Sequence, residues 1–181
     1  MDSDYWIKFW KDYTSNISDK DEQTQVLRTL RKVPISSELW ELTVNYIDSI
    51  LNVKKGDYIL DLCCGNGLLS RYFAEKGAKV VAVDISEELL KKIKDIDGIE
   101  VIHSDIQKLE FKKHTFDKIV CYAGIQYFNK KESLNLLCKA FMWLNAKGVL
   151  FLGDVPDANK IWDFYNTKER KRAYFDSLIH L

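Results

Sequence analysis

Short apolar segments alternate with amphipathic segments from residue 58 onward. The apolar segments are nearly continuous rather than alternating, which is typical of strands that are buried on both faces. Apolar residues recur at helical spacing in the stretches between them, so the pattern predicts a parallel sheet with helices on both faces. The predicted strands are Tyr58–Cys63, Lys79–Val83, Ile99–Ile102, Lys118–Cys121 and Gly148–Gly153, and the predicted helices are 68–76, 87–96 and 132–144.

Residues 1–52 have a different pattern, which predicts three helices. The first contains an aromatic stripe, the second runs from Asp21 to Lys32 with acids first and bases last, and Pro34 ends it. Ser36 or Ser37 is expected to cap the third. The stripe consists of Tyr5, Trp6, Phe9, Trp10 and Tyr13, and the face predicted to be buried on the third helix consists of Leu39, Leu42, Tyr46, Ile47 and Ile50.

The chain therefore divides into three predicted parts. Residues 1–52 form a helical lid, 53–155 form the α/β core, and 156–181 form a helical segment that begins at about Lys160. A lid is expected because a parallel sheet leaves a bound ligand exposed at its strand ends.

Composition narrows the classes of partner. The 27 acidic and 27 basic residues balance, so no overall field favours nucleic acid or an anionic membrane. No apolar stretch reaches the roughly 18 residues of a membrane span. The four cysteines, at positions 63, 64, 121 and 138, form no CxxC pair that would indicate zinc, so no metal site is expected. Buried thiols in a reducing compartment, the cytoplasm, are the prediction.

The segment Asp61-Leu-Cys-Cys-Gly-Asn-Gly67 lies between the first predicted strand and its helix. Glycines at this place allow a sharp turn and a close approach of backbone amides to a ligand, although a simple tight turn is the alternative. Asp84 ends the second strand, where a carboxylate can accept both hydroxyls of a ribose. Asp105 follows the third strand and is expected on the adenine side of the same ligand.

These features suit either NAD or S-adenosylmethionine (SAM). Ser70 stands where the dinucleotide fingerprint has its third glycine. Asp61 would repel a pyrophosphate, whereas a carboxylate suits the cationic amino and sulfonium groups of SAM. The sequence therefore favours a methyltransferase over an NAD-dependent dehydrogenase.

These motifs resemble those of the class I, Rossmann-like SAM-dependent methyltransferases. The resemblance covers about residues 56–155 and includes Val-Ala-Val-Asp-Ile-Ser (81–86), His-Ser-Asp-Ile (103–106) and the segment 116–128, which is similar to the small-molecule branch. It implies that SAM is the cofactor, with S-adenosylhomocysteine (SAH) as its product. The binding residues that it implies are Asp61, Cys63, Gly65, Asn66 and Gly67 in the loop, Asp84 and Ile85 near the ribose, Ser104, Asp105 and Ile106 around the adenine, and Cys121 near the methyl group.

Two departures from the family pattern stand out. The Asn-x-x-x-His-His stretch of many members is absent where this chain has Tyr122 through Gln126-Tyr127, so that histidine base is not available. The sixth and antiparallel seventh strands of the fold are not visible either. We therefore expect a fragment of a longer protein or a core that lacks part of its sheet.

A small-molecule acceptor is expected, because the Asx-Pro-Pro-aromatic motif of amino-methylating DNA enzymes is missing and the charge is neutral. The residues expected to contact the acceptor are Tyr122, Gln126, Tyr127 and Asp154, for which core packing or a turn is the alternative. Arg28, aided by Gln25 and Tyr13, is expected to hold the methionine carboxylate, with a solvent-facing arginine as the alternative.

Segments near both ends resemble methyltransferases of bacterial capsule and surface-polysaccharide synthesis, including those implicated in O-methyl phosphoramidate decoration. These segments are Tyr-Trp-x-x-Phe-Trp near the start, 21–28 and Gly-Asp-Val-Pro-Asp (153–157). The resemblance implies an O-methyltransferase with a nucleotide-linked phosphoramidate or sugar acceptor. The main alternative from another class is a SAM-binding regulatory or scaffold module that transfers no methyl group.

Overall fold

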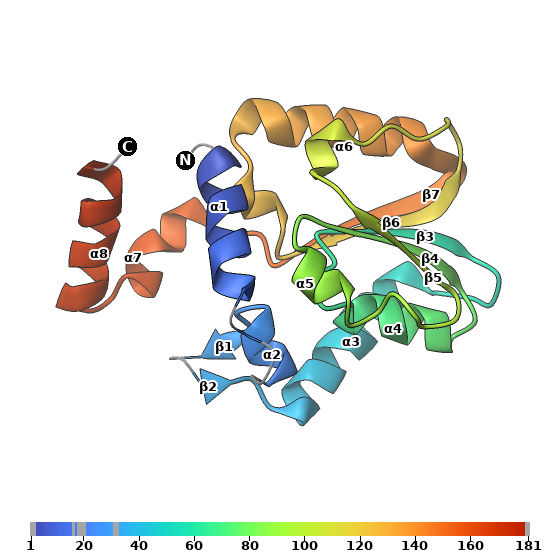
Figure 1. Cartoon of the computed structure of the whole chain (residues 1–181). Coiled ribbons are helices and arrows are strands. Elements are labelled where there is room, and N and C mark those ends of the chain that lie inside the picture. The colour runs from blue at the N-terminus through green and yellow to red at the C-terminus, as the bar shows by residue number, and fades with distance from the viewer. Residues whose placement is uncertain (1–2, 16, 18–20, 31–32, 180–181) are drawn as a thin grey trace.

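The computed structural model describes residues 3–15, 17, 21–30 and 33–179. Its core is a five-stranded parallel sheet with the order β5-β4-β3-β6-β7 (Figure 1). The chain builds outward from β3 to β5, then returns to the other side of β3 for β6 and β7. All five predicted strands are confirmed, as β3 (Tyr58–Leu62), β4 (Lys79–Asp84), β5 (Ile99–His103), β6 (Phe116–Tyr122) and β7 (Leu144–Gly153).

Each face of the sheet has its own apolar core, because alternate residues of the strands point to opposite faces. Ile59 and Val80 contribute to the first core, which also contains residues of α3 (Ser37–Leu51) and α4 (Leu68–Glu75). Leu60 and Val81 contribute to the second, beneath α6 (Lys130–Trp143). The two cores confirm the Rossmann-like α/β prediction.

The remaining elements flank this core. At the start of the chain lie α1 (Ser3–Thr14), α2 (Glu22–Gln25), β1 (Thr29–Leu30) and β2 (Val33–Pro34), and the loops between core elements contain α5 (Glu87–Leu90), η1 (Ile106–Lys108) and η2 (Ile125–Tyr127). The chain continues with η3 (Ala158–Lys160), α7 (Ile161–Phe164) and α8 (Lys168–Ile179). Figure 1 shows α7 and α8 on the far side of α1 from the sheet. None of the described helices is both long and apolar enough to cross a membrane.

The predicted helix over Asp21–Lys32 is wrong beyond Gln25. Asp21 caps α2 as a helix start should, but Leu27 has a φ of +57° and the chain then enters the antiparallel pair β1–β2. The charge pattern of the segment fits a helix dipole, yet the contacts of Arg28 with the core hold the chain in another path. Residues 31–32 lie outside the described part of the chain.

Two further predictions about helices are corrected. Ser36 caps α3 as expected, but the core face of the helix is formed by Val44, Ile47 and Leu51. Of the predicted face only Ile47 is buried. The helix has apolar residues on two sides, and the side that contains Val44 and Leu51 packs against the core. The predicted helix 87–96 ends as α5 at Leu90 and continues as turns. The exposed members of the predicted face are Leu39, Leu42, Tyr46 and Ile50.

The first core tests this packing. Phe73 in α4 is completely buried, whereas Phe141 in α6 is 79% exposed. We expect Phe73→Ala to lower the free energy of unfolding by about 3–5 kcal/mol, because it removes a ring from a closed core. The matched control Phe141→Ala should change it by no more than about 0.5 kcal/mol. Denaturant titration of both variants checks this, and similar losses for the two would contradict the assigned core.

Candidate functional site

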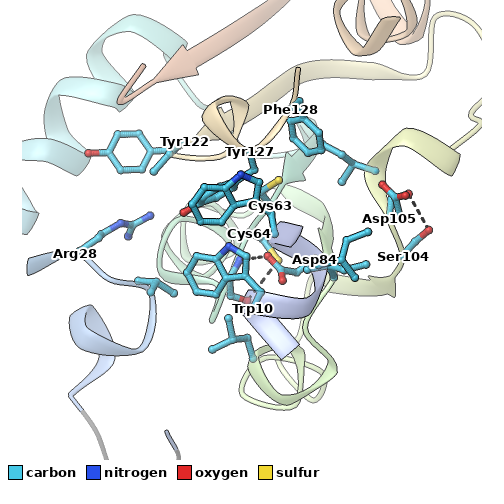
Figure 2. A pocket seen from close by; sticks show the side chains of 18 residues that line it. Trp10, Arg28, Cys63, Cys64, Asp84, Ser104, Asp105, Tyr122, Tyr127 and Phe128 are labelled. Atoms are coloured by element: carbon cyan, nitrogen blue, oxygen red, sulfur yellow. Dashed lines mark hydrogen bonds between the residues drawn. The ribbon is translucent and has the colours of Figure 1, made fainter. Parts of the chain in front are cut away.

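A pocket that is partly open to solvent lies at the carboxyl ends of the strands. The strand order reverses there between β3 and β6, which is where open α/β sheets bind ligands. Figure 2 shows Arg28 and Tyr122 toward one end of the pocket and Ser104 and Asp105 toward the other, with Asp84 between them. The elongated shape suits a ligand with two chemically different ends.

The loop after β3 brings backbone close to this pocket. Gly65 lines it with a φ of +59°, and a Cβ atom there would lie 2.7 Å from Cγ1 of Val26. Gly67 has a φ of +74° and starts α4, where a Cβ atom would collide with Ile93. Both positions therefore require glycine. Cys63 lines the pocket as well, although its φ of +57° is one that glycine adopts more easily.

Asp84 connects the loop to the next element. Its Oδ2 accepts a hydrogen bond from the Gly65 amide at 2.8 Å, and its Oδ1 accepts one from the Ser86 amide at 2.8 Å. Burial raises the pKa of Asp84, and these two amides oppose that rise. Each carboxylate oxygen keeps a lone pair for a further donor. Asp84 also lines the pocket, so a pair of ligand hydroxyls can bind there.

Asp61 lies beneath the loop and is not part of the pocket lining. Its Oδ2 accepts a hydrogen bond from the Ser70 hydroxyl at 2.6 Å. Burial raises the pKa of Asp61 to about 7, against the effects of that hydroxyl and of Arg28. A cation placed nearby would favour the ionised form.

The segment 21–28, which we call the strap, is fastened onto the loop. Asn66 donates from Nδ2 to the Glu22 carbonyl at 2.9 Å and to Oε1 of Gln25 at 3.0 Å. Arg71 forms a two-bond ion pair with the Glu22 carboxylate at 2.8 and 2.9 Å. The Tyr13 hydroxyl donates to the carbonyl of Thr24 in the strap at 2.6 Å.

Three predicted site residues thus act on the strap rather than in the pocket. Asn66, Gln25 and Tyr13 are absent from the pocket lining, and their hydrogen bonds fix the backbone that leads to Arg28. The sequence could not show this, because the partners are separated by 11 to 44 residues.

Arg28 does line the pocket. Its guanidinium carbon lies 4.2 Å from the ring centre of Trp40 and 4.8 Å from that of Tyr122. Burial lowers the pKa of Arg28, an effect opposed by Tyr122, Asp61 and Asp154. Its Nε and Nη1 atoms are buried without a hydrogen-bond partner among the described residues. A solvent-facing arginine, the alternative interpretation of the sequence, is therefore wrong.

The predicted acceptor residues separate into two groups. Tyr122 and Tyr127 line the pocket, whereas Gln126 and Asp154 do not. The Nε2 group of Gln126 donates to the Ala123 carbonyl at 2.7 Å, and its buried Oε1 has no partner among the described residues. Asp154 has a φ of +53° and acts on Arg28 and Tyr122 through its charge.

Cys121 lies below the floor of the pocket. Its thiol is hydrogen-bonded to Cys63, and this contact together with burial raises the pKa of Cys63. Of these two cysteines, only Cys63 belongs to the pocket lining. All four cysteines are free thiols: Cys64 and Cys121 are buried as predicted, Cys63 is partly buried, and Cys138 is exposed.

The other end of the pocket contains Ile85, Ser104, Asp105 and Ile106, all of which line it as predicted. Asp105 caps the short helix η1 by accepting from the Gln107 amide at 2.9 Å. His103 lies next to this end, but a ring nitrogen is 2.9 Å from the Ile85 carbonyl and the residue is not part of the lining.

Several lining residues were not predicted from the sequence. Trp6 and Trp10 of α1 lie against Tyr127, with ring centres 4.8 and 5.7 Å away. Their aromatic stripe is visible in the sequence, but the pattern by itself does not show that it forms a pocket wall. The other unpredicted lining residues are Ile7, Val26, Cys64, Leu89, Ala123 and Phe128, for which no pattern in a single sequence gives a signal.

Comparison with known proteins agrees with this geometry. A family model described as a methyltransferase domain matches residues 59–148. The chain is 33% identical over 101 residues to a demethylmenaquinone methyltransferase of Staphylococcus saprophyticus, covering 49% of this chain and 43% of that protein. It is 32% identical over 113 residues to the putative methyltransferase YqeM of Bacillus subtilis, covering 59% and 45%. The chain thus spans about half the length of the curated relatives it matches.

A solved structure gives the same fold. Phosphoethanolamine N-methyltransferase 1 of Haemonchus contortus, in complex with phosphoethanolamine and S-adenosylhomocysteine, superposes with a TM-score of 0.68 at 20% identity, covering 84% of this chain and 33% of that one. The matching domain model, the sheet order and the pocket at the strand ends agree, and the chain belongs to the class I SAM-dependent methyltransferases.

Proposed function

We propose that this protein transfers a methyl group from SAM to a small-molecule acceptor that supplies its own nucleophile. One observation carries the proposal: a single pocket combines the Asp84 carboxylate, the glycine loop and the Arg28 guanidinium. Asp84 matches the ribose hydroxyls of SAM, the glycine loop matches its amino-acid end, and Arg28 matches the carboxylate at that end.

The chemistry of the two ends of the pocket supports one orientation of the cofactor. Asp84 would accept from the ribose hydroxyls, and Ser104, Asp105 and Ile106 would surround the adenine. Arg28 would bind the methionine carboxylate, while Asp61 would act from below the loop on the cationic amino and sulfonium groups. Bound SAM supplies a methyl group on a sulfonium, which is an electrophile that needs no further activation.

The hydroxyl and thiol groups that line the pocket near its methyl end are poor general bases. Burial raises the pKa of both Tyr122 and Tyr127, so these hydroxyls stay protonated at neutral pH. The Cys63 thiol has a raised pKa as well. Positioning alone can supply about 7–11 kcal/mol of the barrier. An acceptor whose reacting atom is already ionised, and therefore has no proton to lose, fits this site best.

The walls of the pocket favour an apolar, flat acceptor. Trp6, Trp10 and Tyr127 close it from the side of α1, which we propose acts as the lid. The comparisons give no support to the expected role in capsule polysaccharide synthesis. A first acceptor screen should therefore contain a demethylmenaquinol analogue and phosphoethanolamine, as the names of similar proteins suggest, beside nucleotide-linked sugars and phosphoramidates.

The cofactor assignment is tested at Asp84. SAH should raise the melting temperature of the wild type, because a ligand that binds the native state stabilises it. Asp84→Ala should weaken SAH binding by about 1.5–3 kcal/mol, through the loss of charge-assisted hydrogen bonds to the ribose. Asp95→Ala, an exposed acid beyond α5, is the control. Wild-type affinity in Asp84→Ala would refute the ribose assignment.

The stability of the ligand-free protein should fall as pH rises from about 4 to 7. The folded state keeps the proton of Asp61 up to a pKa of about 7, whereas the unfolded chain releases it near 4. The stabilisation is complete below the lower value and is lost as pH passes the upper one, a change on the order of 4 kcal/mol at most. Unfolding titrations across this range should show a smaller slope for Asp61→Asn, and an unchanged slope would contradict the buried acid.

Because the described lining residues near the methyl end are poor bases, single substitutions there should leave the turnover rate measurable. With an acceptor identified by the screen, Tyr122→Phe, Tyr127→Phe and His103→Gln should each keep measurable turnover. A loss of about 10³-fold or more in kcat for one of them would show that this residue removes a proton. The acceptor would then be a neutral hydroxyl rather than a ready nucleophile.

A further inference from the structure

Arg28 occupies a corner between two aromatic rings. The ring centres of Trp40 in α3 and Tyr122 at the end of β6 are 6.2 Å apart, and their planes are inclined by 63°. The guanidinium carbon lies within 4.8 Å of both centres. Two sides of the guanidinium are thus covered by rings. Arg28 also lines the pocket, and Figure 2 shows it there next to Tyr122.

The charge of Arg28 is not neutralised in this position. No carboxylate of the described residues lies within ion-pair distance of it, and its Nε and Nη1 atoms are buried without hydrogen bonds. A buried donor without a partner is costly unless a ligand provides one. The aromatic faces compensate in part, because they attract a cation without saturating its N–H groups.

We propose that Trp40 and Tyr122 are positioning residues that hold the Arg28 guanidinium ready for the carboxylate of the cofactor. The inference rests on the proposed function. It assigns the effect of Tyr122 to its ring rather than to its hydroxyl, and it gives Trp40, which does not line the pocket, a part in cofactor selection.

The backbone around Arg28 supports this arrangement. The Arg28 amide donates to the Gln23 carbonyl at 2.8 Å, which fixes the end of the strap to its start, the part that Asn66 binds. Main chain and side chain are thus fixed by separate contacts. A flat guanidinium can pack against two rings and still offer its N–H groups, whereas a lysine ammonium can do neither with the same geometry.

The test compares two ligands that differ at the carboxylate. SAH contains the amino-acid end, and 5′-methylthioadenosine keeps the adenosine and the sulfur but lacks it. Calorimetry should give the affinities of both for the wild type, Trp40→Leu, Trp40→Phe, Tyr122→Leu, Tyr122→Phe and Arg28→Lys. Tyr46→Leu is the matched control, because Tyr46 lies in the same helix as Trp40 but is 67% exposed.

We expect Trp40→Leu, Tyr122→Leu and Arg28→Lys to weaken SAH binding about tenfold, with less than about a threefold change for methylthioadenosine. Tyr122→Phe should match the wild type, and Trp40→Phe should recover most of the loss. Equal losses for both ligands would overturn the proposal, since they indicate general damage to the pocket. Unchanged SAH affinity in these three variants would overturn it too. For Arg28→Lys, that result would indicate that Arg28 contacts the acceptor instead of the cofactor. If the wild type binds neither ligand, the proposed function fails and this inference fails with it.

Discussion

The site depends on the hydrogen bonds that the Asp84 carboxylate accepts. It joins the amide of Gly65, in the loop after β3, to that of Ser86 at the start of α5. The Ser86 hydroxyl then donates to Thr14 of α1 at 2.9 Å, so the same corner of the molecule also holds the N-terminal helix. A ligand bound at Asp84 would therefore contact the point at which the loop after β3, the end of β4 and the helix α1 are connected.

The second constraint is the path of the strap. Asn66 is part of the loop motif, but its side chain binds the strap instead of the pocket. Val26 fills the space above Gly65 that any larger residue would need. Glycine at this position thus allows the strap to approach as well as leaving room for a ligand. Through these contacts the loop determines where Arg28 lies.

Much of the fold could be predicted from the sequence, because the nearly continuous apolar character of strands such as Tyr58–Leu62 reflects burial on both faces. The glycine loop and Asp84 were predictable for a similar reason, since each follows a strand directly. Other features depend on contacts between distant residues. The β1–β2 pair, the buried side of α3 and the role of Asn66 are decided by packing that a single sequence does not display. Trp6 and Trp10 were visible as a stripe, but nothing in it distinguishes a pocket wall from a core.

The proposed function requires that this pocket, with its strap, binds SAM. Native mass spectrometry of the purified protein, before and after incubation with SAM, measures this most directly. We expect one SAM or SAH molecule per chain of the wild type, and a smaller bound fraction in Arg28→Lys. Binding of NAD in its place, or no adduct at millimolar SAM with the protein folded, would contradict it.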